Sequence, residues 1–496
     1  MADDSDSDLS RPTSSSSKLV LTDTRDRKQH KANLPIRMPC GIIIPNKFVK
    51  VALYEHLTNL QGGPPNSLHY QLYSRWSAGG WGMIITGNVQ VSQQHLTLGR
   101  DMVIPSSLTE SSIAPFRQLA SIIHREQNLN EEDNRATKAG SRSFVLLVQV
   151  KLMFQTPKAA GEKDIDEIVN QFVRGAELAV RSGFDGIEVH ASHGYLLAQF
   201  VMPKANRRKD SYSAISDPLH LLRRVITSIR NSKAVPSNFA IGIKLNAADY
   251  ISQDSNSNTS DSERALSHVI EIAQWDQVDF LEISGGDYEN PDFLNGSQQS
   301  SPRQALFSQF SQRAMEVLES LPNPPSRGRP LVLLTGGLRT PSIISSVLQN
   351  NHADLLGVGR SSVLYPDLPH QYLANPDATH FPVHSEQSGK THIGRVETTL
   401  ISIVQSLWDY LPTRIRPSFP KLIGAGTEMS WYVVKMRELA RERRGIDVVG
   451  FEPGLESIVR MWWYLAPSED RTVGSVWWTW GGIIGIVVAI ICMTWR

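Results

Sequence analysis

The chain has 496 residues, which is enough for one large α/β barrel with additions or for two or three average domains. It carries 50 Lys and Arg against 49 Asp and Glu, so no overall positive field favours nucleic acid, and no nucleic-acid partner is expected. The only cysteines are Cys40 and Cys492; this count excludes a disulfide framework and a cysteine metal site, and we expect no bound metal.

Residues 1–34 are expected to form a disordered tail. Their first 32 residues are rich in Ser, Asp, Lys and Arg, and no apolar segment follows the initiator methionine. Such a composition argues against a secretory signal and is typical of a segment with too little apolar surface to fold.

Between residues 35 and 375, short apolar runs alternate with helical patterns. Eight strands are predicted, at 48–53, 83–89, 144–150, 186–189, 240–245, 280–283, 331–335 and 355–358. Seven helices are predicted between and after them, at 67–78, 114–125, 163–181, 219–232, 260–275, 305–321 and 340–349. This alternation predicts an α/β fold, a (β/α)8 TIM barrel. A doubly wound sheet also alternates, but its phosphate loop normally follows the first strand, whereas the glycine-rich turns here come late.

The region after the barrel has three predicted parts, of which the first two are a linker and a helical extension. Residues 376–395 form a linker, and 396–471 form a helical extension rich in aromatic and basic residues. Within it, the basic stretch KMRELARERR at 435–444 suits either an anionic membrane surface or an ordinary solvated helix face.

Residues 472–495 are predicted to form a single C-terminal transmembrane helix. The run of 24 residues contains no charge and has Trp near both ends. A helix of that length spans roughly 36 Å, more than the ~30 Å apolar core of a bilayer. We therefore expect a membrane anchor that leaves the large domain in the cytosol, at a membrane that the sequence does not specify.

The last two strands each end in a glycine-rich turn. Thr335 is followed by Gly336 and Gly337, and the strand at 355–358 by Gly359 and Arg360. Glycines let backbone N–H groups approach a phosphate, and an arginine can pair with its charge. Either turn alone is a weak signal, but both occur where barrels commonly bind phosphate.

Two polar residues interrupt apolar strands. Lys244 lies in the fifth strand and Gln149 at the end of the third. A buried lysine needs a ligand or a carboxylate, so Lys244 either faces a ligand or forms an ion pair with a residue such as Glu282. If the ligand is a flavin, a cation beside the pyrimidine edge of its ring would stabilise the anionic reduced form. The Gln149 amide could bind the donor and acceptor edge of the same ring.

The end of the fourth strand carries His190, His193 and Tyr195. The histidines could be metal ligands, carbonyl binders or core residues. A zinc site needs three protein ligands, and no clear third is nearby. Two imidazoles donating to a carbonyl oxygen would polarise an enone, with Tyr195 placed to give a proton.

These stretches resemble the Old Yellow Enzyme family, the NADH:flavin oxidoreductases that bind FMN in a (β/α)8 barrel, and are most similar to its fungal members. The resemblance rests on PNKFVKVALYEHL, PNSLHYQLYSRWSAGGWGMIITGNVQVS, GFDGIEVHASHGYLLAQFVMPKANRRKDSY, GIKLNAADY, DFLEISGGDYE, TGGLRT and GVGRSSVLYPDLP. It covers roughly residues 35–375, and the HxxHGYLLxQF text is specific to the family.

The resemblance implies that His190 and His193 hold a substrate carbonyl and that Tyr195 donates a proton. It also implies an FMN site whose ring and phosphate contacts come from Ala52, Gln149, Lys244, Gly336, Gly337, Gly359 and Arg360. The implied reaction is ping-pong: NAD(P)H reduces FMN, and the C=C bond of an α,β-unsaturated carbonyl is then reduced.

Three stretches depart from the family pattern. Tyr54 stands where the family commonly has Cys or Thr, the loop after Gln149 is short, and the turn after Tyr212 lacks the family's glycines and arginine. An altered flavin barrel that serves as a membrane-docked binding protein therefore stays an alternative, as does a barrel that acts on a phosphorylated substrate without flavin.

Overall fold

The computed structural model describes residues 31–124, 140–149, 159–246, 258–284, 302–338, 340–375, 422–441, 453–464 and 466–467. Residues 1–30 of the predicted tail, the predicted linker and the predicted transmembrane helix at 472–495 lie outside these ranges. Within them, no helix combines the length and apolarity that crossing a bilayer requires.

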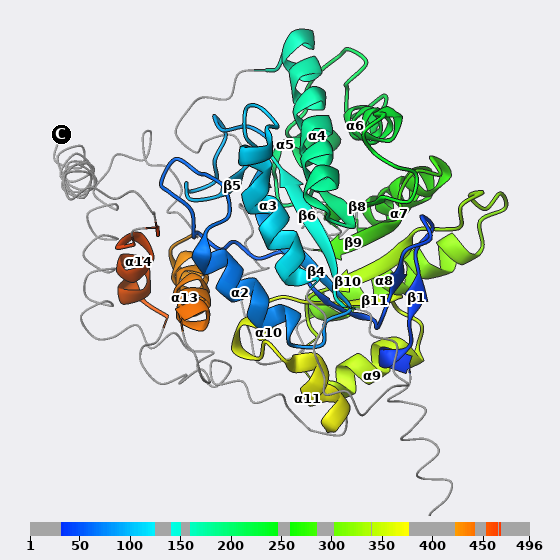
Figure 1. The fold of residues 1–496 in the computed structure, drawn as a ribbon. Coiled ribbons are helices and arrows are strands. Elements are labelled where there is room, and N and C mark those ends of the chain that lie inside the picture. Colours follow the sequence, from blue (N-terminus) through cyan, green and yellow to red (C-terminus); the bar gives the residue numbers. More distant parts are fainter. Residues whose placement is uncertain are drawn as a thin grey trace, which may run out of the picture.

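The described part of the chain contains a closed parallel barrel, which confirms the predicted fold (Figure 1). Its first strand pairs with both the second and the last, so the sheet has no open edge there. A short extra strand, β5 (Met102–Val103), continues the sheet beside β4. The eight barrel strands are β3 (Phe48–Lys50), β4 (Met83–Gln90), β6 (Arg142–Val148), β7 (Gly186–Ala191), β8 (Ala240–Asn246), β9 (Phe280–Ser284), β10 (Leu331–Thr335) and β11 (Leu355–Val358).

Helices surround the barrel, and all seven predicted ones are present. In α4, buried residues at helical spacing, such as Ile165, Val169 and Phe172, face the strands, and Gly183 ends the helix at φ 85°. The helices are α2 (Ser67–Ser77), α3 (Glu110–Ile123), α4 (Glu162–Ser182), α5 (Leu196–Val201), α6 (His220–Asn231), α7 (Asn258–Gln274), α8 (Pro302–Glu319), α9 (Pro341–Gln349), α10 (Ser361–Leu364) and α11 (Leu368–Ala374).

Apolar side chains fill the N-terminal end of the barrel. Phe144 and Phe280 meet edge to face there, with ring centroids 5.5 Å apart. A Cβ on Gly186 would lie 2.4 Å from the Phe144 ring, and one on Gly242 would lie 2.1 Å from the Phe280 ring. The two glycines therefore make room for the rings. The hairpin of β1 (Ile36–Arg37) and β2 (Ile43–Ile44) packs against this cluster, so the opposite end must hold the site.

Two helices of the C-terminal extension pack against the barrel. Helix α13 (Leu422–Arg441) contacts α2, α10 and α14 (Leu455–Trp462), as Figure 1 shows. Both interpretations of the basic stretch at 435–444 are wrong for Lys435 and Arg437, because these side chains are only 2% and 4% exposed.

Arg437 ties the extension to the loop after β3. Its guanidinium donates to the carbonyl oxygens of Met461 at 2.8 Å and Arg460 at 3.0 Å, and to that of His56 at 3.4 Å. It also lies 4.0 Å from the centre of the Tyr464 ring, whose hydroxyl donates to the carbonyl of Leu57 at 2.8 Å. Burial lowers the pKa of Arg437 to about 9. Backbone carbonyls and an aromatic face thus stabilise this cation in place of water.

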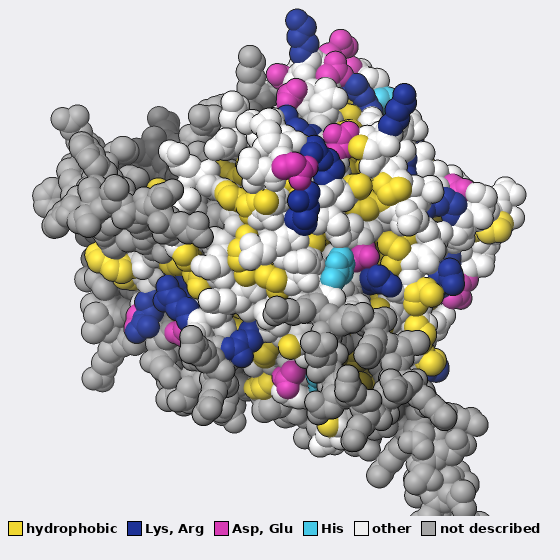
Figure 2. All heavy atoms as spheres, in the orientation of Figure 1, with side chains coloured by type: hydrophobic (Ala, Val, Ile, Leu, Met, Phe, Trp, Pro, Cys, Tyr) yellow, Lys and Arg dark blue, Asp and Glu magenta, His cyan; other side chains and the backbone are white. Residues whose placement is uncertain are grey.

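The face shown in Figure 2 mixes positive and negative side chains, most densely over α3 and α4. Glu110, at the start of α3, bonds both Arg117 and Arg181. The charges on this face are therefore arranged as local pairs.

Candidate functional site

Polar side chains follow the apolar layer toward the C-terminal ends of β7, β8 and β9. Successive side chains of a strand alternate in direction, so Glu188 and His190 share the face of Gly186, which borders the inner Phe144 ring. By the same alternation Lys244 shares the face of Gly242, and Glu282 that of Phe280. Lys244 lies opposite Glu282 in the strand register. These residues are buried and form a polar layer inside the barrel.

The structure brings His190, His193 and Tyr195 together at the end of β7. The ring centres of His190 and Tyr195 are 4.5 Å apart, and those of His190 and His193 are 5.1 Å apart. His193 adopts a left-handed backbone conformation, with φ 59°, and Tyr195 is the residue that precedes α5. A sharp turn after the strand therefore places three ring side chains in one cluster.

Hydrogen bonds define the protonation of the two histidines. The backbone N–H of Ser192 donates to Nδ1 of His190 at 3.3 Å, so a neutral His190 carries its proton on Nε2. The Nε2–H of His190 faces Nδ1 of His193, with 3.3 Å between the two nitrogens. Nε2 of His193 lies 3.0 Å from the hydroxyl oxygen of Ser284. Burial lowers the pKa of both histidines well below their ordinary value. Both rings are therefore neutral N–H donors near pH 7.

Lys244 forms an ion pair inside the barrel. Its Nζ lies 2.5 Å from Oε1 of Glu282, which is the alternative that the sequence left open. Glu188 lies in the same layer. If both glutamates are ionised, neither carboxylate oxygen of Glu188 has a hydrogen-bond partner among the described residues, and Oε2 of Glu282 has none there either.

A proton on Glu188 accounts for these orphaned oxygens. Burial and the neighbouring Glu282 raise the pKa of Glu188 well above its ordinary value, which favours the protonated carboxyl. Burial lowers the pKa of Lys244, but the Glu282 and Glu188 carboxyls outweigh it and the net direction is upward. The layer thus holds one cation, one carboxylate and one carboxylic acid that can donate to that carboxylate.

Replacing Glu188 with Gln is expected to stabilise the protein at pH 7 to 8. A carboxyl whose pKa is raised by folding contributes its full stability below its unfolded pKa of about 4.3, and this contribution is lost as pH rises through the folded pKa. Glutamine keeps the neutral shape and does not titrate. Urea unfolding from pH 5 to 8 should show a flatter pH dependence for the Glu188→Gln variant, and an unchanged profile would contradict a proton on Glu188.

The residues predicted to surround an FMN ring lie on neighbouring strands. Gln149 follows β6 and is 5% exposed, and its Oε1 has no partner among the described residues. Ala52 follows β3 and packs against the inner apolar cluster. Thr335 ends β10, and its buried Oγ1 also lacks a partner in the described part of the chain. Buried polar atoms normally have partners, so these two oxygens are available to a ligand bound at this end of the barrel.

The glycine turns leave space for a phosphate. Gly336 and Gly337 have φ of 104° and 74°, values that favour glycine. A Cβ on Gly336 would meet nothing within 4 Å, and one on Gly359 would make only ordinary contacts, at 3.6 Å and 3.7 Å. At Gly336 the backbone conformation accounts for glycine, while at Gly359 neither the conformation nor the packing requires it. The open space at both turns would let a ligand approach the backbone, so the turns and the orphaned polar atoms fit FMN.

Arg360, predicted to bind the phosphate, already has a protein partner. Its guanidinium donates to the carboxylate of Glu428, on α13. Sequence reasoning missed Glu428, since nothing local connects residues 68 positions apart. It also missed the role of Glu188, although a glutamate two residues before His190 in a strand indicates the same face.

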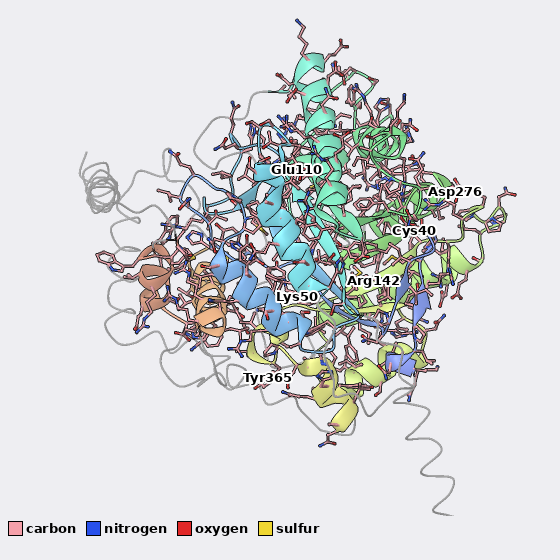
Figure 3. All side chains as sticks on the ribbon, viewed as in Figure 1. Cys40, Lys50, Glu110, Arg142, Asp276 and Tyr365 are labelled. Atoms are coloured by element: carbon pink, nitrogen blue, oxygen red, sulfur yellow. The ribbon has the colours of Figure 1, made fainter. Side chains whose placement is uncertain are left out.

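A second buried charge lies outside the barrel, on Lys50 of β3 (Figure 3). Its Nζ donates to the carbonyl of Ile85 at 3.0 Å and lies 3.9 Å from the centre of the Trp76 ring, on α2. Burial lowers the pKa of Lys50 to about 8, and nearby Glu55 accepts from the hydroxyl of Tyr73. Sequence reasoning missed Lys50, although a lysine in an apolar strand was the signal used for Lys244. The contacts fix the loop that follows β3.

Comparison with known proteins identifies the family of the barrel and agrees with its fold. Residues 35–375 match the family described as NADH:flavin oxidoreductase / NADH oxidase. The NADH-dependent flavin oxidoreductase iccE of Talaromyces variabilis is 29% identical over 82% of this chain and 98% of its own length. The protein iliE of Hypocrea jecorina, with the same description, is 31% identical over 69% of this chain and 89% of its own length. For iliE of Neonectria sp. the identity is 31%, over 72% of this chain and 49% of that protein.

Solved structures share the fold. An old yellow enzyme homologue from Zymomonas mobilis has 16% identity and a TM-score of 0.53, over 72% of this chain and 96% of that one. Morphinone reductase has 19% identity and a TM-score of 0.52, over 73% of this chain and 96% of that one. The protein is therefore a flavin oxidoreductase by class, and the chain belongs to the NADH:flavin oxidoreductase / NADH oxidase family, which includes the old yellow enzymes. The family uses FMN, with NAD(P)H as electron donor.

Proposed function

We propose that this protein is an ene-reductase that uses NAD(P)H and FMN to reduce the C=C bond of α,β-unsaturated carbonyl compounds in a ping-pong cycle. The observation that carries the proposal is the cluster of His190, His193 and Tyr195, which stands at the end of β7 next to the layer that contains Lys244. Two neutral N–H donors beside a buried phenol suit an activated carbonyl substrate.

The chain's own residues would hold the cofactor at its two ends. Gln149 and Lys244 would contact the ring, beside Ala52, while Gly336, Gly337, Gly359 and Arg360 would hold the phosphate. FMN, when bound, accepts hydride from NAD(P)H and delivers it to an electron-poor carbon. Lys244 would favour negative charge at the ring's edge, because it is the cation of the polar layer.

The histidines would bind the substrate carbonyl. The carbonyl oxygen would accept from Nε2–H of His193 in place of the Ser284 hydroxyl. It would accept from Nε2–H of His190 in place of Nδ1 of His193. Both donors are neutral, so they polarise the carbonyl without fully protonating it. Tyr195 would hold the proton for the alkene carbon on its phenol oxygen. His190 and Tyr195 are buried, which strengthens the hydrogen bonds that they would make to the substrate.

A flavin spectrum and a two-step mixing experiment test this function. The purified protein should show a flavin band or gain one on adding FMN. After reduction with NADPH, it should reoxidise faster with cyclohexenone than with air. Absence of a flavin band under both conditions would overturn the enzyme function, while flavin without faster reoxidation would leave a binding protein.

A flavin-binding or docking protein without turnover is the second candidate. It is favoured by one observation: both predicted cofactor cations, Lys244 and Arg360, already pair with carboxylates of this chain. The mixing experiment separates the two candidates, because only an enzyme couples enone to flavin reoxidation.

We also propose that residues 472–495 tether the protein to a membrane, with the barrel in the cytosol. The support is the uncharged run of 24 residues with Trp near both ends. Deleting residues 472–496 should move the protein from the membrane pellet to the supernatant without changing its flavin absorbance. Continued sedimentation of the shortened protein would place the anchor elsewhere.

A further inference from the structure

Arg360 joins the end of the last barrel strand to the C-terminal extension. Arg360 follows Gly359 at the end of β11, and its guanidinium is bonded to the carboxylate of Glu428 on α13. The two side chains are 27% and 24% exposed, so solvent only partly screens the pair. Tyr432, one turn further along α13, lies 6.0 Å from the same guanidinium. A helix outside residues 35–375 therefore reaches into the proposed cofactor site.

A carboxylate and a phosphate compete for the same kind of partner. Both are anions that accept hydrogen bonds from a guanidinium, and each is repelled by the other. Binding of the FMN phosphate at Arg360 must therefore displace Glu428 from the guanidinium or place two anions beside one cation. Either outcome weakens FMN binding.

We propose that Glu428 is a specificity-determining residue that opposes the phosphate of FMN at Arg360. This inference rests on the proposed function, since it requires a flavin in the barrel. Glu428 reduces the advantage that FMN has over a flavin without phosphate, and FMN binding alters the contact between α13 and the barrel. The extension thereby becomes part of the cofactor site.

Other contacts hold α13 in place without Glu428. The hydroxyl of Ser457 donates to the carbonyl of Thr427 at 2.9 Å, and Arg437 donates to the backbone of α14 and of the loop after β3. Glutamine at position 428 can still accept a hydrogen bond from Arg360. A Glu428→Gln variant therefore removes the charge and leaves the helix in position.

The test compares two flavins that differ only in the phosphate. Flavin-free wild-type protein and the Glu428→Gln variant are titrated with FMN and with riboflavin, and binding is followed by flavin fluorescence. The variant should bind FMN roughly tenfold more tightly than wild type, with riboflavin affinity unchanged. The matched control is Glu438→Gln, which makes the same change on the same helix, where the carboxylate pairs with Lys435 at 2.7 Å. This control should leave both affinities unchanged.

Three results would overturn the proposal. FMN affinity could be unchanged or weaker in Glu428→Gln, riboflavin affinity could rise as much as FMN affinity, or Glu438→Gln could produce the same gain. In each case wild type still binds flavin, so the proposed function stands. Failure of wild type to bind either flavin would overturn both proposals.

Discussion

A protein with both His190 and His193 replaced by alanine is expected to bind FMN normally and to lose at least about a hundredfold in enone-dependent reoxidation, the typical effect of removing a donor to a developing oxyanion. The two rings are the N–H donors of the cluster beside Tyr195, which follows β7, whereas the glycine turns follow β10 and β11. Stopped-flow reoxidation with cyclohexenone, together with phenol titration of the flavin band, measures the loss.

The matched control is His352→Ala, at the opposite end of the barrel. His352 precedes β11, and its ring lies 2.7 Å from the hydroxyl of Ser308. Its loss should leave enone-dependent reoxidation unchanged. If the double variant instead loses its flavin, the pair supports the fold or cofactor site and does not bind substrate.

Replacing Lys244 with methionine is expected to lower the free energy of unfolding by about 3–5 kcal/mol near neutral pH. Lys244 is the partner of Glu282 in the polar layer, and both side chains are buried. Without the cation, the buried Glu282 carboxylate has no compensating charge. Urea unfolding at pH 8 measures the loss.

A second substitution provides the internal check. In Lys244→Met with Glu282→Gln, the buried charge is gone, and most of the lost stability should return. Arg117→Met, which breaks an exposed ion pair with Glu110, should have a much smaller effect. If Lys244→Met alone is as stable as wild type at pH 8, the ion pair does not contribute to the folded state.

The barrel and the histidine cluster could be predicted because their signals are local. Each strand is a short apolar run and each helix has its own periodicity, so the count of eight follows from neighbouring residues. His190, His193 and Tyr195 lie within six positions at a strand end, and a single turn brings them together. Their proposed roles as substrate-binding residues stay predictions.

The contacts between distant segments could not be predicted in this way. Arg437 looks like part of an ordinary charged helix face, and its contacts with the backbone of His56 and Met461 appear only in the folded structure. The pairing of Arg360 with Glu428 has the same origin. Glu188 is a partial exception, because its spacing of two residues from His190 can be read from the sequence. The proton that it shares with Glu282 follows only from the three-dimensional arrangement of the polar layer.

The docking of α13 and α14 has a practical consequence for anyone who prepares this enzyme. The family boundary at residue 375 suggests a convenient place to trim the gene, yet residues 422–441 and 453–464 pack against α2 and the loop after β3. A recombinant barrel cut at that boundary would expose to solvent an apolar surface that the extension covers in the full chain. Aggregation of such a fragment would therefore say nothing about whether the intact protein is an active catalyst.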